Sequence, residues 1–248
     1  MTPAILTQGN FDAVLFDLDG VVTATAKVHA ACWKRMFDAF LTEYCAETSH
    51  VFIPFDIVAD YGRYVDGKLR QDGVKSFLQS RGIDLPEESS DTAKDQPTIA
   101  ELGRRKDALF VEGLRQNGVE TMADGMALVR QVRAAGLKTA VVSSSKNCLA
   151  VLQAAGIEDF FAVRVDGVTV ERLHLAGKPA PDGFLKAAEL LGVAPHRCVV
   201  VEDAISGVQA GRRGHFGLVV GVARKGDADE LLRNGAHIVV SDLKSLIV

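Results

Sequence analysis

The sequence is poor in cysteine and has no pair of cysteines at the spacing of a metal or redox motif. Its 248 residues include four cysteines, Cys32, Cys45, Cys148 and Cys198, which are scattered along the chain. The Cys-x-x-Cys pairs typical of zinc sites and redox motifs are therefore absent. We expect the thiols to be buried and the protein to work in a reducing compartment.

An excess of basic residues and long apolar runs are also missing. Lys and Arg number 28 against 32 Asp and Glu, a formal charge of -4 that disfavours a nucleic-acid partner. No run approaches the roughly 18 apolar residues of a membrane span, and the first residues do not resemble a signal peptide. Because 48% of the residues are hydrophobic, global disorder is excluded. We therefore expect a soluble, cytoplasmic protein.

What the sequence does contain is a series of short apolar runs that alternate with amphipathic segments. The runs are residues 13–16, 138–142, 162–165, 198–201, 218–222 and 237–240, and the clearest helical patterns are residues 125–135, 147–155, 182–191 and 227–234. Unbroken apolar strands that alternate with helices indicate a parallel sheet covered by helices on both faces. The predicted fold class is thus α/β, a doubly covered parallel sheet.

One long stretch breaks this rhythm and predicts a second domain. Residues 27–44, 72–80 and 99–116 have helical patterns, and the polar segment 86–97 is typical of an exposed loop. We therefore predict an α/β domain made of residues 1–26 and 117–248, with a helical domain, residues 27–116, inserted after the first strand.

Acidic residues follow the first predicted strand. In a parallel sheet, ligands bind beyond the carboxyl ends of the strands, so polar residues there are candidates for chemistry. Asp17 and Asp19 alternate along the chain and can face one site. A hairpin turn at Asp19-Gly20 is the simpler alternative. A calcium-binding EF-hand loop is disfavoured because Val21 occupies a ligand position.

Three further strand ends or loops carry polar residues. Ser143-Ser144-Ser145-Lys146-Asn147 begins a helix and could only cap it, or could bind an anion. Lys178 lies in a proline-rich segment and could be a surface lysine, and Asp203 of Glu202-Asp203 could cap the next helix. Taken together, carboxylates from two strands suit magnesium, while a lysine and hydroxyls suit a phosphoryl group.

These segments resemble the haloacid dehalogenase superfamily over nearly the whole chain. The matching motifs are, in chain order, Asp17-Leu18-Asp19-Gly20-Val21-Val22-Thr23, Ser143, Lys178-Pro179 and Glu202-Asp203. Within the superfamily the sequence is most similar to the β-phosphoglucomutase-like group, through Thr25-Ala26-x-x-His29 with Trp33, Gly177 to Asp182, and Glu202-Asp203-Ala204-x-Ser206-Gly207. The resemblance implies a Rossmann-like sheet with a helical cap domain after the first strand.

The resemblance also implies how the catalytic residues act. Asp17 would be the nucleophile that accepts the phosphoryl group, and Asp19 the general acid and base. Ser143 and Lys178 would bind the phosphoryl group being transferred. Mg²⁺ would be the cofactor, bound by Asp17, the Asp19 carbonyl and Asp203, with Glu202 beside them.

The same resemblance supplies candidates for substrate binding. They are His29, Gly67, Arg70, Lys106, Ser144, Ser145 and Asn147. Arg70 would bind the distal phosphate of the substrate, and His29 would couple the cap to Asp19. The alternatives are solvated surfaces for Lys68, Arg70 and Lys106, and a histidine that merely packs in a helix for His29.

Three positions depart from the family pattern and bear on which sugar is bound. Ala24 replaces an acidic residue, Leu69 replaces a serine, and Lys68 is displaced from the usual lysine position. The phosphoryl-transfer motifs are unaffected by these changes.

The resulting hypothesis is a phosphohexomutase that converts β-glucose 1-phosphate to glucose 6-phosphate, acting as a monomer on a small phosphorylated sugar. A phosphatase that uses the same aspartate is the alternative. A dehalogenase is disfavoured because Asp19 is present, a non-enzymatic sensor because all four motifs are present, and dinucleotide binding because no Gly-x-Gly-x-x-Gly follows a strand.

Overall fold

The computed structural model describes residues 6–88, 97–224 and 226–247, which form two compact units. The first unit combines Met1–Thr25 with Val119–Val248, and the second is Ala26–Gly118. The polar segment 86–97 lies largely outside the described residues. Within the described ranges, no helix is long and apolar enough to cross a membrane.

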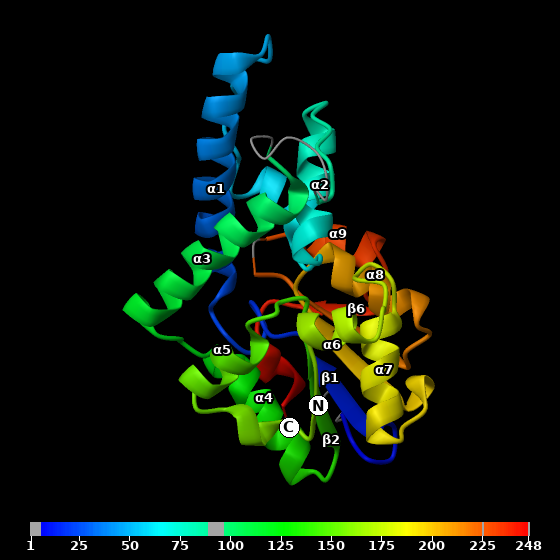
Figure 1. Cartoon of the computed structure of the whole chain (residues 1–248). Coiled ribbons are helices and arrows are strands. Elements are labelled where there is room, and N and C mark those ends of the chain that lie inside the picture. Colours follow the sequence, from blue (N-terminus) through cyan, green and yellow to red (C-terminus); the bar gives the residue numbers. More distant parts are fainter. Residues whose placement is uncertain (1–5, 89–96, 225, 248) are drawn as a thin grey trace. The chain divides into compact units, whose positions relative to one another are not determined.

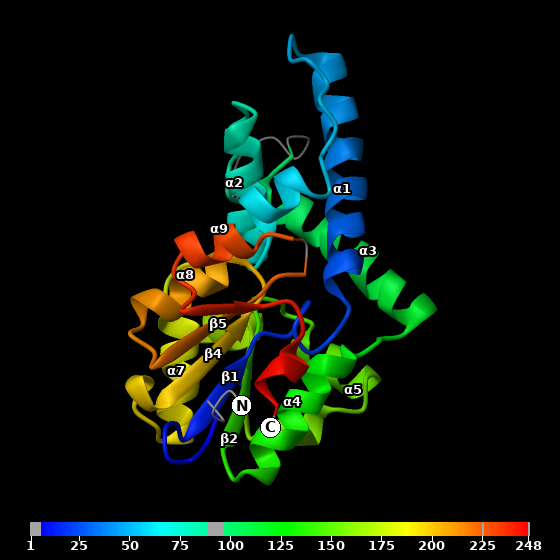
Figure 2. The same cartoon turned by 180° about the vertical axis from the view of Figure 1, so that it is seen from behind.

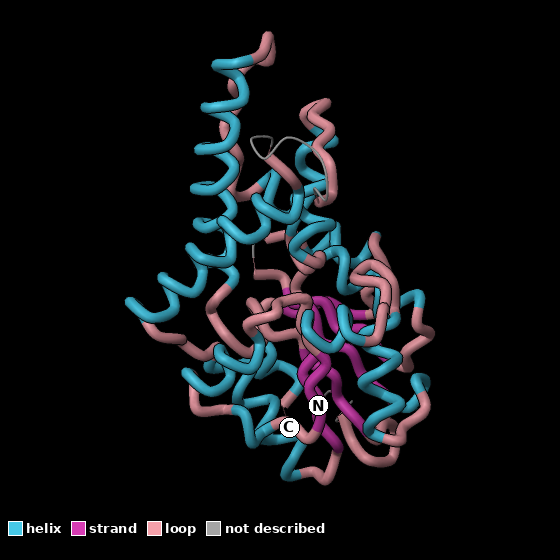
Figure 3. Tube along the Cα trace, viewed as in Figure 1, coloured by secondary structure: helices cyan, strands magenta, loops and turns pink. Residues whose placement is uncertain are grey.

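The first unit is built on a six-stranded sheet in which every pairing is parallel (Figures 1 and 3). In spatial order the strands are β3 (Val163–Val165), β2 (Lys138–Val142), β1 (Ala13–Phe16), β4 (Cys198–Glu202), β5 (Leu218–Val222) and β6 (Ile238–Val240). Helices cover both faces, as the two opposite views show (Figures 1 and 2). They are α4 (Ala123–Ala134), α5 (Cys148–Ala154), α6 (Gly167–Arg172), α7 (Asp182–Leu191), α8 (Ile205–Arg213) and α9 (Ala228–Arg233).

The predicted fold class is therefore confirmed, and the apolar runs explain it. All residues of β1, β4 and β5 are buried, because helices lie against both faces of the central strands. β1 lies between β2 and β4, so the residues that follow these three strands share one edge of the sheet.

Two helices of this unit were not predicted, α6 and α8. α6 has only six residues, and α8 contains two glycines that lower its intrinsic helix propensity. Gly207 in α8 is required by packing, since a Cβ there would lie 1.7 Å from Glu202 Oε1. Close approach to a buried carboxylate, rather than helix propensity, explains this glycine.

The second unit is helical and has an aromatic core of its own. Its helices are α1 (Ala26–Glu47), α2 (Arg70–Ser80) and α3 (Ile99–Asn117), and a π-helical turn, η1 (Tyr61–Val65), precedes α2. The rings of Phe37 and Phe77 lie 4.1 Å apart, and Trp33 and Phe55 each stack on Phe37 at 5.3 Å. The predicted helices are thus present with ends that differ by at most three residues, whereas the π-helical turn was not predicted.

All four cysteines are free thiols, and three of them are buried as expected. Burial raises the pKa of the Cys198 thiol to about 12, so this group stays protonated and unreactive at neutral pH. Cys45 is only half-buried.

Candidate active site

Four charged residues meet at the carboxyl edge of the sheet. Asp17 follows β1, Glu202 ends β4 and Asp203 follows it, while Lys178 comes from the loop before α7. Their exposed fractions are 6% for Asp17 and Lys178, 4% for Asp203 and zero for Glu202. Buried charges are rarely found without a partner or a function, so this cluster is the strongest candidate for a site.

Lys178 joins two of the carboxylates. Its Nζ lies 2.5 Å from Asp17 Oδ1 and 2.6 Å from Glu202 Oε1, and it also donates to the Val142 carbonyl at 3.2 Å. The ammonium group lies 4.9 Å from the centre of the Phe184 ring. The lysine predicted from a proline-rich segment is therefore not a surface residue.

Burial and charge shift the pKa values in this cluster. Burial raises the pKa of Asp17 well above its usual value, and the Lys178 ammonium opposes that shift. Burial alone would lower the pKa of Lys178, but Asp17 and Glu202 raise it above its usual range. Lys178 therefore favours the charged form at neutral pH, and it faces the carboxyl group expected to act as the nucleophile.

The carboxylates also form a potential metal site. Asp17, Glu202 and Asp203 each offer one oxygen, and these oxygens lie within 4.8 Å of one another. Three carboxylates exceed the single positive charge of Lys178, and oxygen donors are those that Mg²⁺ prefers. The donor set thus fits a hard divalent cation. Gly20 leaves room for the Asp203 carboxylate, since a Cβ at residue 20 would lie 2.1 Å from Asp203 Oδ2.

The N-cap position of α8 is one residue later than the alternative for Asp203 supposed. The residue before α8 is Ala204, and its amide donates to Glu202 Oε2 at 2.9 Å. Glu202 therefore uses one oxygen for Lys178 and the other for the chain that enters α8.

Asp19 is partly exposed and is bound by hydroxyl groups on both sides. Thr25 Oγ1 donates to Asp19 Oδ1, and Ser143 Oγ lies 3.5 Å from Asp19 Oδ2. Thr23 Oγ1 lies 2.6 Å from the Thr25 hydroxyl and also donates to the Leu18 carbonyl at 3.2 Å. Asp19-Gly20 is therefore part of a turn, as the simpler alternative had it, but not of a hairpin, since β1 pairs in parallel with both of its neighbours. The turn presents a carboxylate held by hydrogen bonds.

Thr25 had not been singled out as a functional residue. Besides its place in the Thr25-Ala26-x-x-His29 motif, its sequence signal is that Thr23 and Thr25 alternate, so that both hydroxyls can point the same way if the chain is extended. That signal is weak without knowledge that Asp19 lies beside them.

The serine-rich loop after β2 is organised by its own hydroxyl groups. Ser143 is buried, and its Oγ accepts a hydrogen bond from the Ser145 amide at 3.1 Å. The Asn147 amide donates to Ser145 Oγ at 3.2 Å, immediately before α5. Ser144 is half-buried in the same loop. The structure thus places Ser143 near Asp19 and uses Ser145 to organise the entry to the helix.

In the helical unit, His29 and Lys106 form a buried pair. Lys106 Nζ lies 2.5 Å from His29 Nδ1, with exposed fractions of 4% and 9%. The imidazole stacks on Phe110 at 4.0 Å, and the ammonium lies 5.2 Å from the Trp33 ring centre. The solvated-surface alternative for Lys106 is therefore wrong, and His29 does pack against an aromatic ring.

The remaining candidates of the helical unit lie at the start of α2. Gly67 has a φ of 69°, a left-handed conformation that favours glycine, and Arg70 is the first residue of the helix. Arg70 Nη2 lies 2.6 Å from Asp107 Oδ1 on α3. Gly103 leaves space for this side chain, since a Cβ there would lie 3.3 Å from Arg70 Cδ. Lys68 donates to Ser76 Oγ at 2.8 Å, and burial lowers its pKa.

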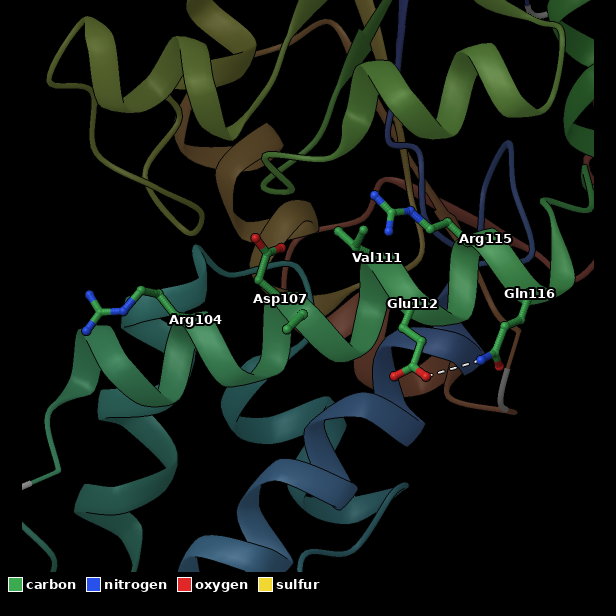
Figure 4. A pocket seen from close by; sticks show the side chains of 7 residues that line it. Arg104, Asp107, Val111, Glu112, Arg115 and Gln116 are labelled. Carbon is green, nitrogen blue, oxygen red and sulfur yellow. Dashed lines mark hydrogen bonds between the residues drawn. The ribbon is translucent and has the colours of Figure 1, made fainter.

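One face of α3 also carries a shallow hollow (Figure 4). Its lining residues are Arg104, Asp107, Ala108, Val111, Glu112, Arg115 and Gln116. All of them come from this single helix, and Gln116 donates to Glu112 within it at 3.2 Å. The hollow includes Asp107, the ion-pair partner of Arg70, but none of the predicted site residues.

Comparison with known proteins agrees with this geometry. Residues 11–215 match the family described as haloacid dehalogenase-like hydrolase, and the chain belongs to this family. The chain is 51% identical over 238 residues to a β-phosphoglucomutase of Mycobacterium bovis, a match that covers 95% of this chain and 91% of the relative. A β-phosphoglucomutase of Bacillus subtilis is 33% identical, covering 80% and 77%.

A solved structure supports the same fold. The β-phosphoglucomutase of Clostridium difficile superposes with a TM-score of 0.73 at 24% identity, covering 95% of this chain and 93% of that one. Sequence and fold together make this chain a phosphoryl-transfer enzyme of the β-phosphoglucomutase-like group.

Proposed function

We propose that this enzyme is a phosphohexomutase that interconverts β-glucose 1-phosphate and glucose 6-phosphate through a phosphorylated Asp17. The observation that supports this proposal best is the arrangement of two carboxylates with different surroundings. Asp17 is buried beside Lys178, whereas Asp19 is partly exposed and bound by hydroxyl groups. The first environment suits a nucleophile, and the second suits a group that exchanges protons with substrate.

In the first step, which phosphorylates the enzyme, an Asp17 carboxylate oxygen attacks the C1 phosphorus of glucose 1,6-bisphosphate, and glucose 6-phosphate is the leaving molecule. The bond from phosphorus to the sugar oxygen breaks, and the protonated Asp19 carboxyl group gives its proton to that leaving oxygen. Lys178 and the Ser143 hydroxyl bind the phosphoryl oxygens, whose charge is redistributed during transfer. Contact between Lys178 and Asp17 in the resting protein supports this role.

In the second step, which forms glucose 1,6-bisphosphate again, the Asp19 carboxylate removes a proton from the 6-hydroxyl group of β-glucose 1-phosphate. That oxygen attacks the phosphoryl group on Asp17, and the bond between phosphorus and the Asp17 oxygen breaks. Asp17 returns as a carboxylate and Asp19 is again protonated. Atoms and protons therefore balance over one phosphoryl transfer in each direction.

A divalent cation fits this scheme. We propose that Asp17, the Asp19 carbonyl and Asp203 bind Mg²⁺ with Glu202 beside them, in keeping with the grouping of the carboxylates. The cation would reduce the repulsion between the Asp17 carboxylate and the phosphoryl oxygens.

For the helical unit we propose a role in choosing the sugar phosphate. Arg70 is the best candidate for the second phosphate because a guanidinium group binds phosphate oxygens in pairs. His29 and Lys106 are proposed to contribute as the buried pair described above, with Gly67 shaping the loop before α2. Ser144, Ser145 and Asn147 are the corresponding candidates in the α/β unit.

A phosphatase is the second candidate, since the matching family is described as hydrolases. The two functions differ in whether a sugar hydroxyl or water accepts the phosphoryl group from Asp17. The deciding experiment supplies β-glucose 1-phosphate, Mg²⁺ and a trace of glucose 1,6-bisphosphate, and measures glucose 6-phosphate and free phosphate together. Glucose 6-phosphate without matching phosphate is the expected result. Free phosphate without the isomer would make the enzyme a phosphatase.

A further inference from the structure

An arginine outside the four motifs binds the backbone of the turn that carries Asp19. Arg224 lies just beyond β5, and its Nε donates to the Gly20 carbonyl at 2.9 Å. Its two terminal nitrogens donate to both carboxylate oxygens of Asp124, at 2.8 and 3.0 Å. The guanidinium group thus joins the residue after Asp19 to the first turn of α4.

Asp124 is itself fixed by a third element. The Leu243 amide donates to its Oδ2 at 3.0 Å, and Leu243 begins the last helical turn of the described chain. The side chains of Arg224 and Asp124 are 16% and 11% exposed. A bidentate, partly buried ion pair of this kind is more rigid than an ion pair on the surface.

The same turn contacts α4 directly. The Met122 amide donates to the Val22 carbonyl at 2.8 Å, and a Cβ at Gly125 would lie 2.0 Å from the Val21 carbonyl oxygen. Gly20 has a φ of 91°, so the turn depends on a conformation that other residues rarely adopt. Such a conformation persists when surrounding contacts fix it.

We propose that Arg224, oriented by Asp124, is a positioning residue for the general acid and base Asp19. It acts through the Gly20 carbonyl and touches neither substrate nor the reacting atoms. With Arg224 in place, the peptide after Asp19 has one orientation, and the carboxyl group stays within reach of Thr25 and Ser143. This inference rests on the proposed function for the role of Asp19.

The chemistry of the leaving group provides a test that a merely structural role would not satisfy. A sugar oxygen is a poor leaving group and requires the proton from Asp19, whereas an activated donor such as acetyl phosphate transfers its phosphoryl group without that proton. We compare the wild type with Arg224→Gln, using β-glucose 1-phosphate with the bisphosphate as one donor system and acetyl phosphate as the other. Phosphorylation of Asp17 by acetyl phosphate is followed by mass spectrometry.

The expected result is a fall in kcat with the sugar phosphate of about 10- to 100-fold, because a displacement of about 1 Å in a catalytic group has this effect. KM and the rate of Asp17 phosphorylation by acetyl phosphate should change less than about threefold. Equal losses with both donors would overturn the proposal, because they would mean general disruption of the site. An unchanged kcat would overturn it as well.

Three controls separate the possible failures. Arg197→Gln is matched to Arg224→Gln, because Arg197 also binds a carboxylate with two nitrogens and donates to backbone carbonyls, in contact with Asp12, Gly9 and Asn10. Arg197→Gln should lower the stability of the protein without changing the ratio of its rates with the sugar phosphate and with acetyl phosphate. If Arg224→Gln does not fold, Asp124→Asn replaces it, because asparagine has nearly the shape of the aspartate that orients Arg224. It should show a smaller loss of rate with the sugar phosphate and again little loss with acetyl phosphate.

The third control is Asp19→Asn, in which the loss of rate with the sugar phosphate should exceed the loss with acetyl phosphate by the largest factor. The double variant Asp19→Asn/Arg224→Gln should then be no slower than Asp19→Asn alone. If the two losses multiply instead, Arg224 does not act through Asp19 and the inference is wrong. If Asp19→Asn itself loses no more rate with the sugar phosphate than with acetyl phosphate, the proposed function fails rather than the positioning by Arg224.

Discussion

The two units of this protein place their charged residues in different ways. In the α/β unit the carboxyl groups of Asp17, Glu202 and Asp203 are buried at strand ends, and backbone hydrogen bonds of a parallel sheet fix the points from which they project. In the helical unit, Arg70 and Lys106 lie on helices and contact side chains of other helices, Asp107 and His29. We infer that phosphoryl transfer requires the rigid arrangement, whereas recognition of a sugar can use the more variable one.

Two of the three sequence departures fall in the helical unit, whereas the third, Ala24, lies in the α/β unit just beyond the first motif. Lys68 and Leu69, which differ from the family pattern, belong to the helical unit, while all four motifs of the α/β unit are complete. Variants in the α/β unit should therefore change rate, and variants in the helical unit should change substrate preference.

The largest effect is expected from Asp17→Asn, which removes the nucleophile. Loss of a nucleophile leaves only binding and electrostatic contributions, so turnover should fall by on the order of 10⁴-fold or more. The matched control is Asp12→Asn, at the other end of β1, where the carboxylate pairs with Arg197 at 2.8 Å. Steady-state turnover of the two variants tests this, and retained turnover in Asp17→Asn would exclude Asp17 as the nucleophile.

The next largest effect is expected from Lys178→Met. It removes a donor to the phosphoryl group, which should raise the barrier by about 3 kcal/mol. It also leaves Asp17 and Glu202 buried without their shared cation, which should lower the free energy of unfolding by about 3–5 kcal/mol. Turnover and urea denaturation measure the two effects, and Lys138→Met, which loses only a bond to the Leu191 carbonyl, is the control. A variant with wild-type turnover would contradict the assignment.

A smaller and different effect is expected from Arg70→Gln in the helical unit. Loss of a charged contact to the second phosphate should raise KM for β-glucose 1-phosphate about tenfold while kcat changes little. Arg105→Gln is the control, since Arg105 lies on the exposed face of α3 and pairs with Glu101. If kcat falls with unchanged KM, Arg70 acts on the rate rather than on substrate binding, and the proposed division of roles between the two units is wrong.

The smallest effect concerns stability in acid. Burial would raise the pKa of Asp124, but hydrogen bonds from Arg224 and the Leu243 amide outweigh it, and the pKa lies below its usual value of 3.8. A lowered pKa in the folded state contributes stability above the unfolded pKa, and this contribution is lost as the pH falls through the folded value. The difference in urea midpoint between wild type and Asp124→Asn should therefore shrink as the pH drops below about 4. A difference that grows on acidification would refute this account.

Much of the α/β unit could be predicted from sequence because its strands are short apolar runs with clear ends. The ranges 13–16, 138–142 and 218–222 coincide with β1, β2 and β5. The order of the strands then brings the residues after β1, β2 and β4 to one edge. The local sequence pattern and the geometry of a parallel sheet are therefore enough to predict these strands and the edge at which the site lies.

Other features could not be predicted because they depend on partners far apart in the chain. Arg224 and Gly20 are 204 residues apart, and Arg224 and Asp124 are 100 apart. Nothing near Arg224 in the sequence distinguishes it from a surface arginine. The burial of Lys106 was missed for the same reason, since its partner His29 is 77 residues away on another helix.

The sequence by itself therefore determined the alternation of strands and helices and the kinds of polar residue that follow β1, β2 and β4. These depend on periodicity and residue chemistry, which are local. The tertiary structure decided that Lys178 lies between Asp17 and Glu202, that Thr25 binds Asp19 and that Arg224 binds the turn after it. Hydrogen bonds and ion pairs are short and directional, so their partners are fixed only when the packed elements bring them together.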